Sequence, residues 1–121
     1  MKSYKDLDIY NNAFRLAVDC NRLSMKLPKY ELYETGSQLR RSSQSTRTNI
    51  VEGYGRKDYK KEFVRYLVFA HASNLETKDH LEMLKELYGV EGINELIDKV
   101  DNLGKQIFAF IRYVEKNWKT H

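Results

Sequence analysis

Arginines alternate with hydroxyl and amide side chains between residues 38 and 56, in a pattern able to bind phosphate oxygens. The stretch reads QLRRSSQSTRTNIVEGYGR. On a helix, Arg40, Gln44 and Arg47 would share one face, and Arg41 and Thr48 the adjacent one. Guanidinium groups hold phosphate in bidentate fashion, and hydroxyl and amide groups add hydrogen bonds. A subunit contact would use the same side chains, so the sequence leaves both interpretations open.

A second cluster of cations follows in GYGRKDYKK, where two tyrosines are interleaved with the basic residues. Aromatic rings among cations suit stacking on unpaired bases. The segment lacks the spacing of a phosphate-binding P-loop and connects two helices, so nucleotide hydrolysis is not predicted. The candidate nucleic-acid-binding residues are Arg40, Arg41, Arg47, Arg56, Lys57, Lys60 and Lys61.

One pair of residues suggests catalysis. Arg65 precedes His71 by six residues, a spacing that resembles the Arg and His pair of helical ribonucleases of the HEPN type. Arg65 would stabilise a phosphorane and His71 would transfer protons, although His71 also fits a core position. We therefore expect a non-catalytic protein and keep the ribonuclease as a less favoured alternative. No other residues have the spacing of a catalytic, metal or cofactor site, and none is predicted.

Composition predicts a single globular domain over residues 1–121. Hydrophobic residues make up 41% and charged residues 31% of the chain. No apolar run approaches the roughly 20 residues that span a bilayer, so no membrane association is expected. Cys20 has no partner for an intramolecular disulfide, which favours a cytoplasmic location.

The charges are unevenly distributed. Residues 40–65 contain eight basic and three acidic side chains, a net charge of +5. Residues 76–101 contain eight acidic side chains and three lysines, a net charge of −5. The basic region would attract an anionic polymer, or it would meet the acidic region of another copy.

Apolar periodicity predicts four helices and no strands. The first begins near Asp6, the second covers residues 31–54, the third follows an N-cap at Asp58 and stops at Gly89, and the fourth spans about 25 residues from Ile93. Short connections make neighbours antiparallel, so we expect an all-α, up-down antiparallel four-helix bundle. The inward positions of the second helix are mostly small, which predicts close packing: Leu39, Ser43, Thr46, Ile50 and Gly53.

The region around the second helix resembles the signature of the proteins encoded in intervening sequences of 23S ribosomal RNA genes. This family is related to the accessory variability determinant of diversity-generating retroelements. The matching residues are Leu27-Pro28, Glu31, Gln38 to Arg41, the small-residue run 42–48, Asn49 to Gly53 including Glu52, and Arg56. Ser42, Ser43 and Val51 replace the alanines usual in the family.

The resemblance implies a four-helix bundle that assembles into a homopentamer without catalytic activity. It also implies binding of RNA or DNA and a protein partner such as a reverse transcriptase. A structural or adaptor protein that binds other proteins is the alternative from a different class.

Overall fold

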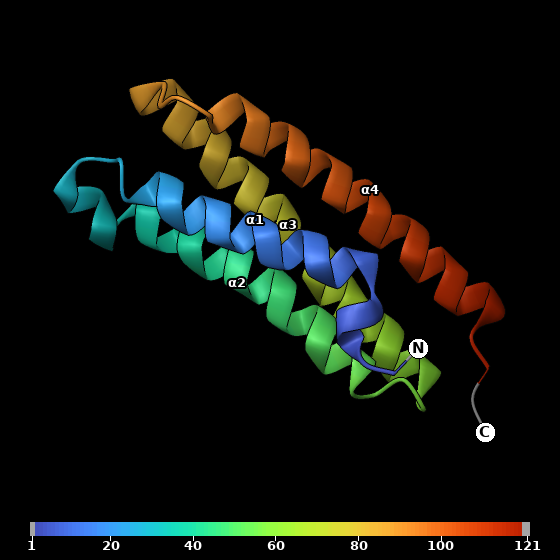
Figure 1. Cartoon of the computed structure of the whole chain (residues 1–121). Coiled ribbons are helices and arrows are strands. Elements are labelled where there is room, and N and C mark those ends of the chain that lie inside the picture. The colour runs from blue at the N-terminus through green and yellow to red at the C-terminus, as the bar shows by residue number, and fades with distance from the viewer. Residues whose placement is uncertain (1, 120–121) are drawn as a thin grey trace.

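The computed structural model describes residues 2–119 and forms a long bundle of four helices (Figure 1). Two short 3-10 segments, η1 and η2, precede the first and second helices. The elements are η1 (Tyr4–Asp6), α1 (Asp8–Ser24), η2 (Lys29–Tyr33), α2 (Thr35–Tyr54), α3 (Lys60–Tyr88) and α4 (Ile93–Asn117). None of these helices combines the length and the apolarity needed to cross a membrane.

Each helix packs against two neighbours, in the cyclic order α1, α2, α3, α4. Successive helices run in opposite directions, with η2 and the α3–α4 turn at one end and η1 and the α2–α3 turn at the other (Figure 1). The predicted all-α, up-down antiparallel four-helix bundle is therefore confirmed. The packing between α2 and α3 is the most extensive.

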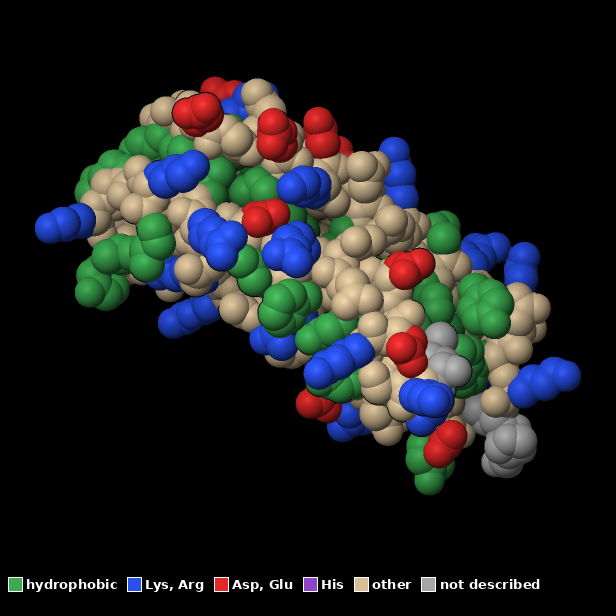
Figure 2. All heavy atoms as spheres, viewed as in Figure 1, with side chains coloured by type: hydrophobic (Ala, Val, Ile, Leu, Met, Phe, Trp, Pro, Cys, Tyr) green, Lys and Arg blue, Asp and Glu red, His purple; other side chains and the backbone are tan. Residues whose placement is uncertain are grey.

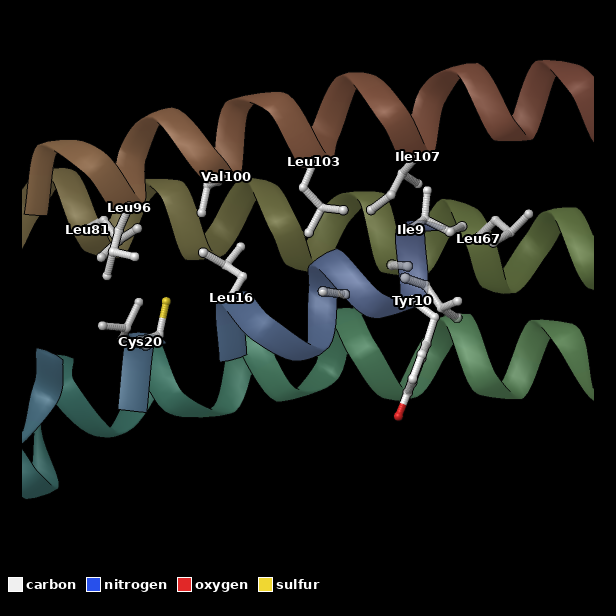
Figure 3. Close-up of a cluster of buried hydrophobic side chains, with 14 of the residues drawn as sticks. Ile9, Tyr10, Leu16, Cys20, Leu67, Leu81, Leu96, Val100, Leu103 and Ile107 are labelled. Atoms are coloured by element: carbon white, nitrogen blue, oxygen red, sulfur yellow. The ribbon is translucent and has the colours of Figure 1, made fainter. Parts of the chain in front are cut away.

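The core is a continuous apolar cluster with contributions from all four helices. Figure 3 shows Leu16 and Cys20 of α1 pointing toward Leu96 and Val100 of α4. The buried stripe of α4 follows Leu96, Leu103 and Ile107, whereas the next residues along the chain, Ile97 and Gly104, are half-buried. Gly104 lies at an edge of the α3–α4 contact that is open to solvent.

Small side chains let α2 approach α3 closely, as predicted. Ser43 and Thr46 are buried and return hydrogen bonds to backbone oxygens of the preceding turn, which satisfies their hydroxyl groups. Gly53 faces α3 so closely that a Cβ there would lie 3.2 Å from Tyr66 Cβ. Ser42 adds a buried hydrogen bond across the seam, accepting from Thr77 Oγ1 at 2.9 Å.

Three helix starts differ from the predicted positions. The second helix begins at Thr35, not Glu31, because residues 29–33 form the 3-10 segment η2 and turn the chain after Pro28. The first helix begins at Asp8, after η1. Asp58 makes no cap: the N-cap of α3 is Tyr59, without a side-chain hydrogen bond. The predicted stop at Gly89 was right, since this glycine adopts a left-handed conformation with φ 57°.

Candidate nucleic-acid interface

A shallow groove of about 540 Å³ lies on the outer face of α2, beside the end of α1. Its lining combines two arginines with five neutral hydrogen-bonding side chains: Asn21, Ser37, Arg40, Arg41, Gln44, Ser45 and Thr48. Within residues 2–119, no carboxylate contributes to this lining. Such a surface offers donors to an anion without repelling it.

The two adjacent arginines of this groove have different surroundings. Arg40 is half-buried and donates to Ser24 Oγ at 3.0 Å and to the Leu32 carbonyl oxygen at 2.6 Å. It therefore connects α2 to α1 and η2, and its guanidinium is largely engaged within the chain. Arg41 is exposed. Of the two, Arg41 has the freer donors for a ligand.

Three more of the predicted cations are anchored to neighbours on their own segment. Arg47 donates to Gln44 Oε1 through two nitrogen atoms, at 2.7 and 3.1 Å. Arg56 pairs with Glu52 at 2.7 Å, and this carboxylate raises the pKa of Arg56. Lys57 places its ammonium 4.7 Å from the centre of the Tyr54 ring. These contacts orient the cations but leave them within reach of solvent.

Lys60 and Lys61 lie apart from the α2 groove. They border a hollow between the start of α3 and the end of α4, with Val64 and Glu115. About 20 Å of helix axis separates Arg41 from the α2–α3 turn, at about 1.5 Å per residue. The seven predicted residues therefore form a band along the bundle instead of one compact patch.

Figure 2 shows how the charges are distributed on one face of the molecule. Acidic side chains gather over the α3–α4 turn and the beginning of α4, while basic side chains, with some acidic ones among them, are spread over the rest of this face. The two charged regions of the sequence meet on α3, which contains the end of the basic region and the beginning of the acidic one.

The sequence motif residues have mainly structural positions. Pro28 is the N-cap of η2, Gly53 contacts α3, and Asn49 donates to the Ser45 carbonyl oxygen at 2.9 Å. Glu52 orients Arg56, while Gln38 is exposed near the start of α2. These residues shape α2 and its junctions.

Sequence reasoning missed Asn21 and Ser37 as groove residues. Ser37 lies one turn before Arg41, so helical spacing alone would have found it. Asn21 belongs to α1, and no sequence signal places it beside α2.

The structure does not bring Arg65 and His71 together. Six residues separate them by about 120° around the helix. Arg65 pairs with Glu62 at 3.6 Å and lies over the Phe69 ring, whereas His71 borders a groove with α4.

Burial raises the pKa of the Cys20 thiol to about 12, so this thiol is not an activated nucleophile. Within residues 2–119, no three His, Cys, Asp or Glu side chains are placed to hold a metal ion.

Comparisons with known proteins identify the family. A crystal structure of a protein of unknown function from the S23 ribosomal protein family of Bacteroides thetaiotaomicron VPI-5482 has a similar fold, with a TM-score of 0.73 and 20% identity. The match covers 86% of this chain and 98% of that one. No curated protein matches the chain. The family model for the 23S rRNA-intervening sequence protein matches residues 5–109, and the chain therefore belongs to this family.

Proposed function

We propose that this chain is a non-catalytic, homo-oligomeric protein of the cytoplasm that binds RNA or DNA through the basic surface of residues 40–61. The observation that carries the proposal is the α2 groove, which presents Arg41 among neutral hydrogen-bonding side chains and no carboxylate within the described residues. The cations of the α2–α3 turn extend this surface along the bundle. Contacts to phosphate would supply most of the affinity.

Assembly would strengthen a surface that is weak in one copy. Identical grooves that face one way in a homo-oligomer, such as the pentamer implied by the family resemblance, would engage one strand at several points. A reverse transcriptase remains the proposed protein partner. It follows from the resemblance to the accessory variability determinant and not from any contact in the chain.

A salt titration with charge-removal variants tests the proposal. Binding of a labelled single-stranded RNA and of a duplex DNA would be measured from low to physiological salt. We expect log affinity to fall linearly with log salt, with a slope of about 0.7 to 0.9 for each phosphate neutralised. The double variant Arg41→Gln/Arg47→Gln should bind more weakly and with a smaller slope. Arg40 stays unchanged because it anchors η2.

The control for this titration is Arg15→Gln. Arg15 borders a different groove, between α1 and α4, and its replacement removes the same charge as each change in the double variant. Weakening by Arg15→Gln that equals the weakening by Arg41→Gln alone would show that only net charge matters. Affinity that is insensitive to salt, or that the double variant retains, would contradict the proposal.

A protein-binding adaptor is the second candidate, and a specific observation favours it. The outer side of α3 exposes five large apolar side chains, which we call the α3 stripe: Val68, Phe69, Leu75, Met83 and Leu87. Large apolar side chains exposed along one side of a helix are typical of protein contacts.

Sedimentation of wild type and Arg47→Glu separates the candidates. Loss of the oligomer in this variant, without nucleic-acid affinity in wild type, would favour the adaptor.

A further inference from the structure

A second groove, of about 320 Å³, lies between α3 and α4 on the side away from the α2 groove. Its floor is formed by Asn74 and Gly104, and Leu75 and Phe108 form its walls. This is the edge of the α3–α4 contact at which Gly104 is half-buried. None of these residues belongs to the basic surface of residues 40–61.

The floor of this groove contains an acceptor without a donor. Asn74 is 2% exposed, and its Nδ2 donates to the Val100 carbonyl oxygen at 2.9 Å. Because that carbonyl can only accept, the amide orientation is fixed and Oδ1 faces away from it. No donor from residues 2–119 reaches Asn74 Oδ1. This oxygen is itself buried, so its missing hydrogen bond is a cost of the α3–α4 contact.

Glycine at position 104 makes room for the Asn74 amide. A Cβ atom on Gly104 would lie 3.1 Å from Asn74 Nδ2, close enough to press on the amide. The half-buried glycine therefore accommodates Asn74 beneath the groove. The combination of a small residue and a buried amide gives the groove a floor without projecting side chains.

The walls suit a planar ring. Phe108 is 54% exposed and Leu75 is 55% exposed, so both present apolar surface to an incoming group. The His71 ring lies 6.3 Å from that of Phe108, at a tilt of 54°. Stacking on a solvent-exposed aromatic ring is the usual way in which proteins hold an unpaired base.

Cations flank the aromatic wall. Lys105 lines the groove, and Arg112 lies one turn beyond Phe108, with its guanidinium 5.9 Å from the ring centre. Lys78 is held by Asp101 at 2.8 Å, which neutralises the one carboxylate in the lining. An aromatic residue with a cation on each side matches a base with a phosphate on each side. A purely apolar protein segment would gain nothing from these two cations.

We propose that the α3–α4 groove captures one unpaired base of single-stranded RNA or DNA. The base stacks on Phe108 above the floor formed by Asn74 and Gly104, while Lys105 and Arg112 contact the flanking phosphates. This inference rests on the proposed function and specifies it: the preferred partner is a single strand, and the α2 surface supplies additional phosphate contacts.

The test compares strands with and without bases. Three probes are each titrated with the full chain. They are a labelled ten-residue oligoadenylate, an abasic strand of the same length and charge, and the duplex DNA of the salt titration. Wild type should bind the oligoadenylate most tightly. Phe108→Ala should weaken oligoadenylate binding by about tenfold and leave binding of the abasic strand unchanged. Phe14→Ala is the matched control, since Phe14 is 45% exposed on α1.

The outcomes separate the two proposals. Equal affinity of wild type for the oligoadenylate and the abasic strand, or full binding by a folded Phe108→Ala variant, overturns base capture and leaves the basic surface standing. If no strand binds at low salt, both proposals fail. If Phe108→Ala dissociates an oligomer and weakens both strands equally, the groove is a subunit contact and base capture is again overturned.

Discussion

Gly36, at the start of α2, lies against the backbone of η2. A Cβ atom at this position would clash with the Glu31 carbonyl oxygen, far inside van der Waals contact. We therefore expect Gly36→Ala to lower the free energy of unfolding by about 1–3 kcal/mol, since the junction must move. Urea denaturation followed by circular dichroism measures the change.

Gly55→Ala is the control for this substitution. Gly55 has an ordinary helical φ of −62°, and the nearest atom to an added Cβ is 3.5 Å away. Its replacement should leave stability unchanged or raise it by up to about 1 kcal/mol. Similar losses in the two variants would mean that the contact with Glu31 does not determine the result.

Adjacent residues of one type can have different roles, and the sequence does not distinguish them. Arg40 and Arg41 were equivalent candidates, yet Arg40 reaches Ser24 and the Leu32 carbonyl oxygen while Arg41 stays exposed. The difference depends on where η2 places its backbone, which no local pattern encodes. The inward packing of Ser43 and Thr46 was predictable because helical periodicity alone determines it.

At the scale of elements, η2 is attached to the end of α3 through a buried carboxylate. Glu31 is 3% exposed and accepts from the Thr35 N–H at 3.0 Å and from the Tyr88 hydroxyl at 2.6 Å. Tyr88→Phe keeps the ring but removes a donor to this carboxylate. We expect this change to lower the free energy of unfolding, because the buried carboxylate loses a hydrogen-bond donor. Tyr33→Phe, which alters a residue that is 84% exposed, should change it by less than about 0.5 kcal/mol.

The same contact gives this prediction a pH signature. The hydrogen bond to the Glu31 carboxylate raises the pKa of Tyr88 above its usual value. The folded chain therefore favours the protonated phenol, and this contribution is lost as pH rises above about 10, where the unfolded phenol ionises. Wild type should lose more stability than Tyr88→Phe above that pH. If the free energies of unfolding of the two proteins change equally with pH, the hydroxyl contributes little.

Helices with long apolar stripes were predictable, and short junctions were not. The 25 residues of α4 and the glycine stop of α3 follow from periodicity and from one left-handed residue. The 3-10 segment η2 has no such period, and its geometry depends on tertiary contacts through Glu31 and Arg40. Asp58 had the right residue type for a cap, but the chain turns one residue later.

At the scale of the whole molecule, the predicted basic region became a band along the bundle. Sequence could count its cations, but it could not show that Lys60 and Lys61 face Glu115 while Arg41 faces Asn21. The α3–α4 groove was not predictable at all. It lies where Asn74 of α3 packs against Gly104 of α4, which is a property of two helices together.

The α3 stripe leads to a prediction about assembly. Val68 is 48% exposed and Met83 is 52% exposed, and both lie on the side of α3 away from the core. A homo-oligomer that buries this stripe would remove apolar surface from water. We expect wild type to sediment as a homo-oligomer, and Val68→Glu/Met83→Glu to sediment near the 14.4 kDa of one chain because buried carboxylates would oppose the contact.

The design of this experiment keeps assembly distinct from folding and from strand binding. Phe14→Glu introduces a carboxylate at a similarly exposed apolar residue of α1, so it should leave the oligomer intact if the contact is specific to α3. Neither substituted residue lines the α2 groove or the α3–α4 groove. A folded, monomeric double variant should therefore keep its preference for strands with bases while losing the affinity that several linked sites provide. A monomeric wild type, or a double variant that sediments like wild type, would exclude assembly through the α3 stripe.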